Sequence, residues 1–406
     1  MKETGERPGG PRALLADRDY LRLWLVGGLS NAVRWLELLA AGVFTYDLTG
    51  SGLMVASVTA ARMLPMLLVG ALAGAVADAV NRKTLLMIAL GTTGLSSGLI
   101  GLVALADMLT IWHIWAGGLV SGIVWAGEMA VRRRMVGEVA GPTRVAPAVA
   151  LDTVTGSLTR MIGPALGGLL LETVGIACVY GLSAVLYLTG LALVVGLRYS
   201  QETRPLRLAQ IPGDIAAGFA VARRSEIIMA VLATTVVMNA FGFSYTAMIP
   251  PIGRQEFGVS ATLVGILASA EAGGSLLGGL LLASGRLNLS RGRVFLAGSF
   301  GLMTAVVLAA LAPWYLLAFF LLLAGGLGAS SFASMQSTLI LTEAPPEMRS
   351  RLMGITTVCI GTGPLGVLAV GVLSDQVGAS TAMLMTGLGG LAGLALIYLR
   401  WPALRR

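Results

Sequence analysis

Long apolar stretches separated by short polar ones run along almost the whole chain. A helix needs about 20 predominantly apolar residues to cross a bilayer. Twelve stretches reach that length, at residues 21–46, 52–77, 84–106, 111–131, 144–171, 174–197, 227–252, 260–283, 294–312, 314–341, 352–373 and 381–399. The pattern therefore predicts an all-α membrane protein with twelve transmembrane helices.

The longest polar interval, residues 198–226, has six apolar stretches on each side. Short motifs recur in the same order in the two halves: EVAGPTR and EAPPEMR, then Gly-Pro at 163–164 and 363–364, then ETVG at 172–175 and DQVG at 375–378. A parallel repeat of six spans is one of the transporter architectures. We therefore predict an N-terminal six-helix bundle at 1–197, a cytoplasmic central loop at 198–226 and a C-terminal six-helix bundle at 227–406.

Composition supports this class. The 406 residues are 56% apolar and 12% charged, whereas soluble domains carry about 25% charged residues. The 55 glycines fit close helix packing in lipid. Both cysteines, Cys178 and Cys359, lie in apolar stretches and His113 is the single histidine, so we expect no disulfide, no metal site and no cofactor.

Charge sets the expected orientation. The formal net charge is +8, but the Lys and Arg residues gather in every second polar interval, beginning with the N-terminal one. Cytoplasmic loops carry such an excess, so both termini should be cytoplasmic, with Arg254 an exception outside. This distribution indicates membrane topology and no nucleic-acid partner. The first apolar run is too long for a signal peptide and predicts an uncleaved span.

The first span carries unusual polar residues in its middle. Ser30, Arg34 and Glu37 fall on one helical face, and Asn31 lies beside them. A charge at mid-bilayer costs roughly 2.5–3.5 kcal/mol or more unless it faces water or a partner. We therefore expect this face to point toward a protein interior or a cavity.

Charges recur in other spans, and we expect them to neutralise one another. Arg34 and Glu37 are three residues apart and could pair directly. Arg160 is too far along its helix from Asp152, so its partner should lie on another span. Glu128 should form a solvated pair near the end of its span. Arg62 and Glu271 complete the set of buried charges.

Buried acids suggest proton coupling, because a partly dehydrated carboxylate has a raised pKa and can load and release a proton. The candidates are Glu37 first, then Asp152 and Glu271; structural ion pairs are the alternative for each. Candidate substrate-binding residues are the polar and aromatic groups within spans: Ser30, Asn31, Arg34, Arg62, Asn239, Phe243, Glu271 and Gln336. Helix–helix hydrogen bonds are the alternative for these groups.

The loop after the second span reads GAVADAVNRK from residue 74. It resembles the G-x-x-x-D-R-x-G-R-R/K signature of the major facilitator superfamily. The matching residues are Gly74, Asp78, Arg82 and Lys83; Ala79 stands where the family has Arg, and Asn81 where it has Gly. The resemblance implies a conformational latch for the outward-facing state, weakened by the missing Arg.

The fifth span also resembles a family signature, the Gly/Pro-rich helix of antiporter members. The residues that carry it are Gly156, Arg160, Gly163, Pro164 and Gly167, and we expect the glycines to admit a helix of the other half. Residues 132–170 and the stretch PPEMRSRLMGI further resemble the drug:proton antiporter branch that contains the enterobactin exporter and macrolide-efflux proteins.

The resemblance implies a multi-pass exporter of the bacterial inner membrane, working by alternating access. We expect a monomer, although the sequence leaves the oligomeric state open. Its partners would be protons, the lipid bilayer and an amphipathic small-molecule cargo such as a drug, a macrolide-like compound or a siderophore. No P-loop or catalytic constellation is present, so we expect no enzyme. A lipid or lysolipid transporter of the same fold and a non-transporting membrane scaffold stay open as alternatives.

Overall fold

The computed structural model describes residues 11–199, 201, 211–284 and 290–405, and the regular structure of these residues is helical. The first half contains α1 (Pro11–Ala16), α2 (Arg18–Thr49), α3 (Gly52–Ala79), α4 (Arg82–Leu105), α5 (Ile111–Ala140) and α6 (Val145–Val195). The second half contains α7 (Ile211–Ala222), α8 (Glu226–Val237), α9 (Ile249–Pro251), α10 (Ala261–Ala283), α11 (Arg291–Ala310), α12 (Tyr315–Glu343), α13 (Arg349–Ile360), α14 (Gly363–Val377) and α15 (Ala379–Arg400).

Local chemistry sets where these helices begin and end. The Asp17 side chain accepts from the amides of Asp19 and Tyr20 at the start of α2, and Asn81 caps α4 in the same way. Gly50 ends α2 with a φ of 64°, in the left-handed region. Gly175, with a φ of 80°, interrupts the 51-residue α6, so α6 consists of two helices.

Nine of the described helical segments are long and apolar enough to cross a membrane. One of them is α6, which is long enough to cross twice at about 1.5 Å per residue. The other two long helices of the first half are not among the nine: α2 carries several charges, and the apolar segment found in α3 is the shorter Gly52–Leu67. The all-α fold is confirmed, and the count of twelve spans stays a prediction.

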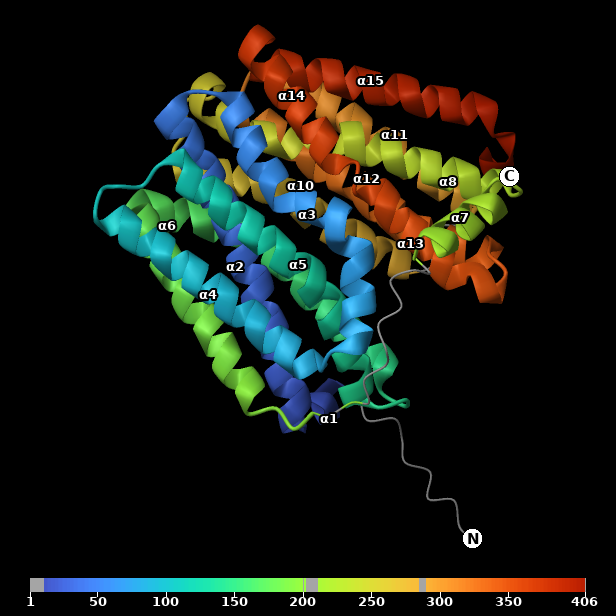
Figure 1. Ribbon diagram of the computed structural model, residues 1–406. Helices are drawn as coiled ribbons and strands as arrows, with labels where there is room; N and C mark the ends of the chain where they lie inside the picture. The colour runs from blue at the N-terminus through green and yellow to red at the C-terminus, as the bar shows by residue number, and fades with distance from the viewer. Residues whose placement is uncertain (1–10, 200, 202–210, 285–289, 406) are drawn as a thin grey trace.

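The two halves of the chain form two groups of helices that meet at one end and diverge at the other (Figure 1). We call the diverging end, which carries Arg18, Arg144 and Glu226, the terminal end. The converging end is the distal end. There Arg254 of the second half pairs with Asp47 of the first at 2.5 Å.

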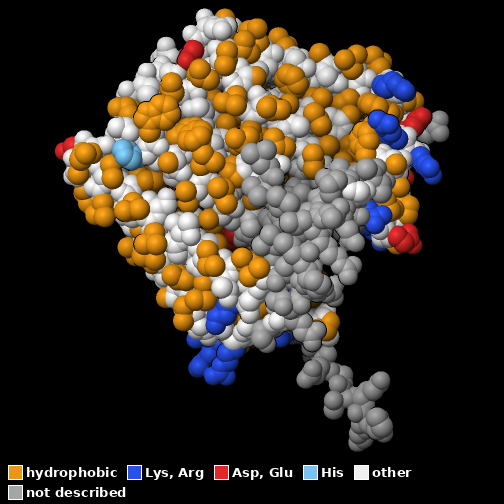
Figure 2. All heavy atoms as spheres, in the orientation of Figure 1, with side chains coloured by type: hydrophobic (Ala, Val, Ile, Leu, Met, Phe, Trp, Pro, Cys, Tyr) orange, Lys and Arg blue, Asp and Glu red, His pale blue; other side chains and the backbone are white. Residues whose placement is uncertain are grey.

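Each half has a core of its own. Leu23, Leu86 and Met135 belong to a buried cluster of the first half, whereas most members of the largest cluster belong to the second. Figure 2 shows a broad band of hydrophobic side chains, with cations gathered at its edges near the chain termini. This surface fits a bundle embedded in lipid.

The seventh span continues past its predicted end at residue 252, and Pro250-Pro251 lies within it. After α8 the chain stays helical through two π-helical turns, η2 (Met238–Gly242) and η4 (Ile252–Glu256), and a tight turn, η3 (Ser244–Met248). The prolines lack an amide hydrogen, and these irregular turns accommodate them.

The predicted central loop also contains a helix, α7. A Cβ at Gly218 would lie 2.8 Å from Ile355 Cδ1, so α7 packs closely on α13 of the second half. The loop is therefore partly structured, and its helical portion belongs with the second half in space.

Candidate functional site

A cavity of about 990 Å³ lies between the two halves and extends from the middle of the bundle to the terminal end. Helices α2, α5 and α6 line it from the first half, and Ser334, Ser337 and Thr338 of α12 line it from the second. Its remaining lining is rich in charged and aromatic side chains: Asn31, Arg34, Trp35, Trp125, Glu128, Arg132, Arg133, Val136, Val149, Asp152, Thr153, Gly156, Ser157 and Arg160.

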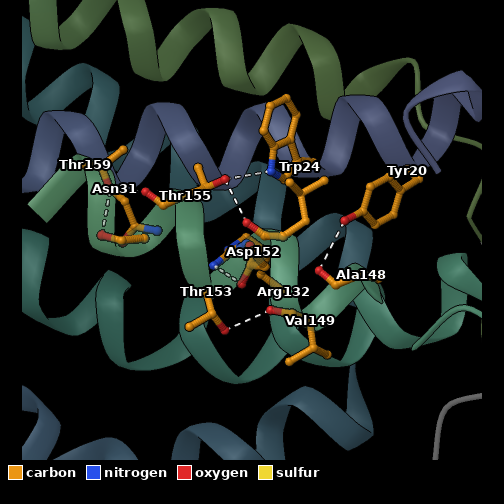
Figure 3. A network of polar contacts seen from close by, with 12 residues as sticks. Tyr20, Trp24, Asn31, Arg132, Ala148, Val149, Asp152, Thr153, Thr155 and Thr159 are labelled. Carbon is orange, nitrogen blue, oxygen red and sulfur yellow. Dashed lines mark hydrogen bonds and ion pairs between the residues drawn. The ribbon is translucent and has the colours of Figure 1, made fainter. Parts of the chain in front are cut away.

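Asp152 lies on the wall of this cavity and is paired with Arg132 of α5. Both guanidinium NH groups of Arg132 donate to the carboxylate, the second at 3.2 Å. Figure 3 shows this pair beside α2, where the Trp24 indole donates to Thr155 at 2.9 Å. The pair thus joins α5 to α6 where α2 packs against α6. It was not predicted, because the predicted fourth span ended at residue 131, whereas α5 continues to Ala140.

Arg34 faces the same cavity, but its partner is not the predicted Glu37. Arg34 pairs with Glu128 at 3.0 Å, donates to Asn31 at 2.9 Å, and stacks over Trp125 at 5.0 Å from the ring centre. Glu128 is 6% exposed. The prediction of a solvated Glu128 is therefore wrong, because the packing of α5 against α2 buries this carboxylate.

Glu37 lies away from the cavity and is fully bonded. Arg62 of α3 donates to its Oε2 at 2.8 Å, and Ser97 of α4 donates to its Oε1 at 2.7 Å. Arg62 also donates to the carbonyl of Arg34. This network ties α2, α3 and α4 together inside the first half.

Arg160 and Glu271 form an ion pair that connects the two halves. The prediction that the partner of Arg160 lies on another span is confirmed, and that span is α10. Glu271 also lines a smaller pocket of about 70 Å³ with Trp35 and Tyr245, between the cavity and the distal end. Its side chain is 4% exposed, and its Oε1 has no hydrogen-bond partner among the described residues.

The predicted substrate-binding residues divide into two groups. Asn31 and Arg34 line the main cavity and Glu271 lines the smaller pocket. Ser30 and Arg62 are buried within the first half. Three others pack inside the second half: Asn239 donates to the Thr235 carbonyl, Gln336 donates to the Thr235 hydroxyl, and Phe243 contacts Phe332.

The predicted packing signature of the fifth span meets the other half only in part. A Cβ at Gly163 would lie 2.6 Å from Trp35 Cβ, and one at Gly167 would lie 2.4 Å from the Leu36 carbonyl, so both positions approach α2 of the same half. Gly156 lines the cavity. The Pro164 carbonyl, in contrast, lies against Gly265 of the second half.

The predicted latch is only partly described. Gly74 and Asp78 belong to α3, but the surroundings of these two positions lie outside what the structure describes. Arg82 bonds to Glu138 and to the Tyr199 hydroxyl, while Lys83 donates to the Val195 and Leu197 carbonyls. Burial and the bond to Glu138 raise the pKa of the Tyr199 phenol, so it stays protonated at neutral pH.

A signal for the missed cavity residues does exist in the sequence. Trp125, Glu128 and Arg132 are spaced three and four residues apart, which places them on one face of α5. An acid and a base on one face of a long helix, one turn from a tryptophan, mark a polar stripe. Among the described residues, no group of three or more His, Cys, Asp or Glu could hold a metal.

Comparison with known proteins adds the family. The sequence model of the transmembrane secretion effectors matches residues 10–405. The enterobactin exporter EntS of Salmonella typhi is 30% identical over 343 residues, which cover 82% of this chain and 76% of that protein. The exporter of the same name from Escherichia coli O127:H6 is 29% identical over 373 residues, covering 90% of this chain and 86% of that one.

Solved structures agree on the fold. A mutant of the nucleoside transporter NupG has a TM-score of 0.75 at 13% identity, covering 95% of this chain and 99% of that one. A bacterial homologue of the lysosomal transporter Spinster, described as inward-facing and unoccupied, has a TM-score of 0.74 at 16% identity, covering 98% and 99%. These relatives and neighbours are transporters and not enzymes. The chain is therefore a multi-pass membrane transporter of the transmembrane secretion effector family, within the major facilitator superfamily.

Proposed function

We propose that the protein exports an amphipathic small molecule across the bacterial inner membrane by alternating access, in exchange for protons. The observation that carries this proposal is the cavity between the halves, which reaches the terminal end while contacts such as Asp47–Arg254 close the distal end. A cargo could enter from the terminal side and leave only after the halves rearrange. The gathering of cations at the terminal end supports a cytoplasmic orientation for it.

The cavity lining supports a cargo with an apolar body and an anionic group. Trp35 and Trp125 offer flat apolar surfaces. Arg133 also lines the cavity and forms no ion pair within the described part of the chain, so the lining carries more positive than negative charge. A siderophore-like cargo agrees with this chemistry and with the enterobactin exporters among the relatives.

Glu271 is the acid best suited to carry the proton. It is buried beside a pocket, one of its oxygens has no hydrogen-bond partner among the described residues, and its ionic partner Arg160 belongs to the other half. Protonation would neutralise the carboxylate and weaken its hold on Arg160. Antiport follows if the cargo binds only while this pair is intact, because the proton and the cargo then compete for the carrier. Asp152 is the second candidate, because it also lies on the cavity wall. Glu37 is less suited, since both its oxygens are bonded and it is not part of the cavity lining.

Proton movement in inverted membrane vesicles containing the full chain tests the proposal. We would acidify the interior and add siderophores, lipophilic drugs and lysolipids one at a time. Collapse of the gradient by a compound is expected, together with loss of that response in Glu271→Gln. As a matched control, Glu347→Gln removes an exposed carboxylate outside the cavity and should respond like the unmodified protein.

Each outcome decides a part of the proposal. A response to lysolipids alone would favour the lipid-transporter alternative. Collapse that persists in Glu271→Gln would remove Glu271 from the coupling step. If no compound collapsed the gradient while labelled compounds still accumulated in the vesicles, proton antiport would be refuted.

A further inference from the structure

The repeated motifs ETVG and DQVG lie outside the cavity, at the distal end. The first ends the first part of α6, and the second ends α14. Gly175 and Gly378 close the two motifs with similar backbone angles, φ 80° and ψ 171° against φ 87° and ψ 157°. The two acids of these motifs, Glu172 and Asp375, therefore hold equivalent positions in the two halves.

Glu172 of the first half bonds to a helix of the second half. Its Oε2 accepts from the amide of Thr262 at 2.9 Å and from the Thr262 hydroxyl. Thr262 is the second residue of α10, and the residue before that helix, Ser260, makes no side-chain cap.

Asp375 of the second half bonds in turn to the start of a helix of the first half. Its Oδ1 accepts from the amide of Leu53 at 3.1 Å, and its Oδ2 accepts from the Ser51 hydroxyl at 2.6 Å. Leu53 is the second residue of α3. Each half thus contributes one carboxylate to the second amide of a helix in the opposite half.

These carboxylates act as N-terminal caps, which a helix usually obtains from residues of its own sequence. The first amides of a helix have no partner inside it, and a carboxylate near them is stabilising. Neither α3 nor α10 has an acid in its first turn. Ser51 accepts from the Met54 amide of α3 at 3.2 Å. The Leu53 amide of α3 and the Thr262 amide of α10 take their carboxylate from the other half while the distal end is closed.

Backbones come close beside both caps. A Cβ at Gly168 would lie 2.1 Å from the Ala261 carbonyl, and a Cβ at Gly371 would lie 2.4 Å from Ala56 Cβ. A close seam between α6 and α10 thus lies beside the Glu172 cap, and one between α14 and α3 lies beside the Asp375 cap. Moving the halves apart at the distal end must break both caps and both seams.

We propose that Glu172 and Asp375 are a matched pair of positioning residues that hold the distal end closed by capping helices of the opposite half. The inference rests on the alternating access proposed above. Removing one cap should shift the ratio of open to closed molecules by about fivefold, the effect of losing a typical helix cap. Removing both should shift it further than either change alone.

The chain offers a matched control. Glu256 accepts from the amide of Ser380 at 2.9 Å and from the Ser380 hydroxyl. Ser380 is the second residue of α15, so this contact repeats the same chemistry within the second half. Glu256→Ala removes a cap without separating the halves.

Distances across the distal end test the proposal. Spin labels would replace Met108 and Leu311, which are exposed there on different halves, after Cys178→Ala and Cys359→Ala. Double electron–electron resonance in lipid nanodiscs would compare the labelled protein with Glu172→Ala, Asp375→Ala, their combination and Glu256→Ala. Circular dichroism and size-exclusion chromatography would confirm that each variant is folded.

A longer distance that grows from the single variants to the double variant, and is absent in Glu256→Ala, is the expected result. An unchanged distance in the folded double variant would overturn the proposal, as would an equal change in Glu256→Ala. The distance measurement needs neither cargo nor protons. Failure of the vesicle assay alone would therefore refute the proposed function, and the proposal that Glu172 and Asp375 hold the distal end closed would stand.

Discussion

The Arg62–Glu37 and Arg160–Glu271 pairs join the same two residue types in different surroundings. The first lies inside one half, and both side chains are less than 10% exposed. The second bridges the halves, and its arginine is 32% exposed. Glu37 has a partner for each oxygen, whereas one oxygen of Glu271 has none in the part of the chain that the structure describes.

This difference teaches what each pair is built to do. Breaking a buried, fully bonded pair leaves a charge without compensation, so such a pair holds one arrangement. A pair beside a cavity can exchange its partner for water or cargo at lower cost. We therefore interpret Arg62–Glu37 as structural and Arg160–Glu271 as a pair that opens during transport.

The largest effect should come from Arg62→Met. It leaves Glu37 buried without its cation and should lower the free energy of unfolding by about 3–5 kcal/mol. Unfolding in mixed detergent micelles measures this loss. The double variant Arg62→Met, Glu37→Gln should recover most of it, because the unpaired charge is gone; no recovery would mean that lost packing is the cause.

A smaller effect is expected from Ser97→Ala. This change leaves Oε1 of Glu37 without a donor and should cost about 1–3 kcal/mol in unfolding free energy. Ser183→Ala is the matched control, since among the described residues that buried hydroxyl bonds only to the Val179 carbonyl of its own helix. Equal losses in the two variants would contradict the structural role given to the Ser97 bond.

The smallest change in stability should come from Glu271→Gln. Glutamine keeps the size of the side chain and Arg160 keeps access to the cavity, so the unfolding free energy should change by less than about 1 kcal/mol. The same unfolding measurement checks this. A loss as large as that of Arg62→Met would place both pairs in the structural class.

Periodicity and composition were enough to predict the all-α fold and the turn within α6. They also predicted that Arg160 must find its partner on another helix. These features follow from the length of apolar runs and from the cost of an unpaired charge in lipid.

The pairing of Arg34 could not be predicted in the same way. Arg34 and Glu37 are helical neighbours, but Glu128 and Arg62 compete for them from α5 and α3. The outcome depends on which helices pack against α2, and local spacing does not contain that information. The same limit applies to Gly163 and Gly167. Glycines in a span predict that another helix approaches closely, but they do not identify that helix.

Pairing of the membrane-embedded charges has an electrical consequence. A transmembrane voltage does work only on net charge, about 2.3 kcal/mol per elementary charge for each 100 mV. An acid and an arginine that move together carry none. In the proposed cycle, the voltage would therefore exert little force on the paired carboxylates of the empty carrier and would act mainly through the proton taken up by Glu271.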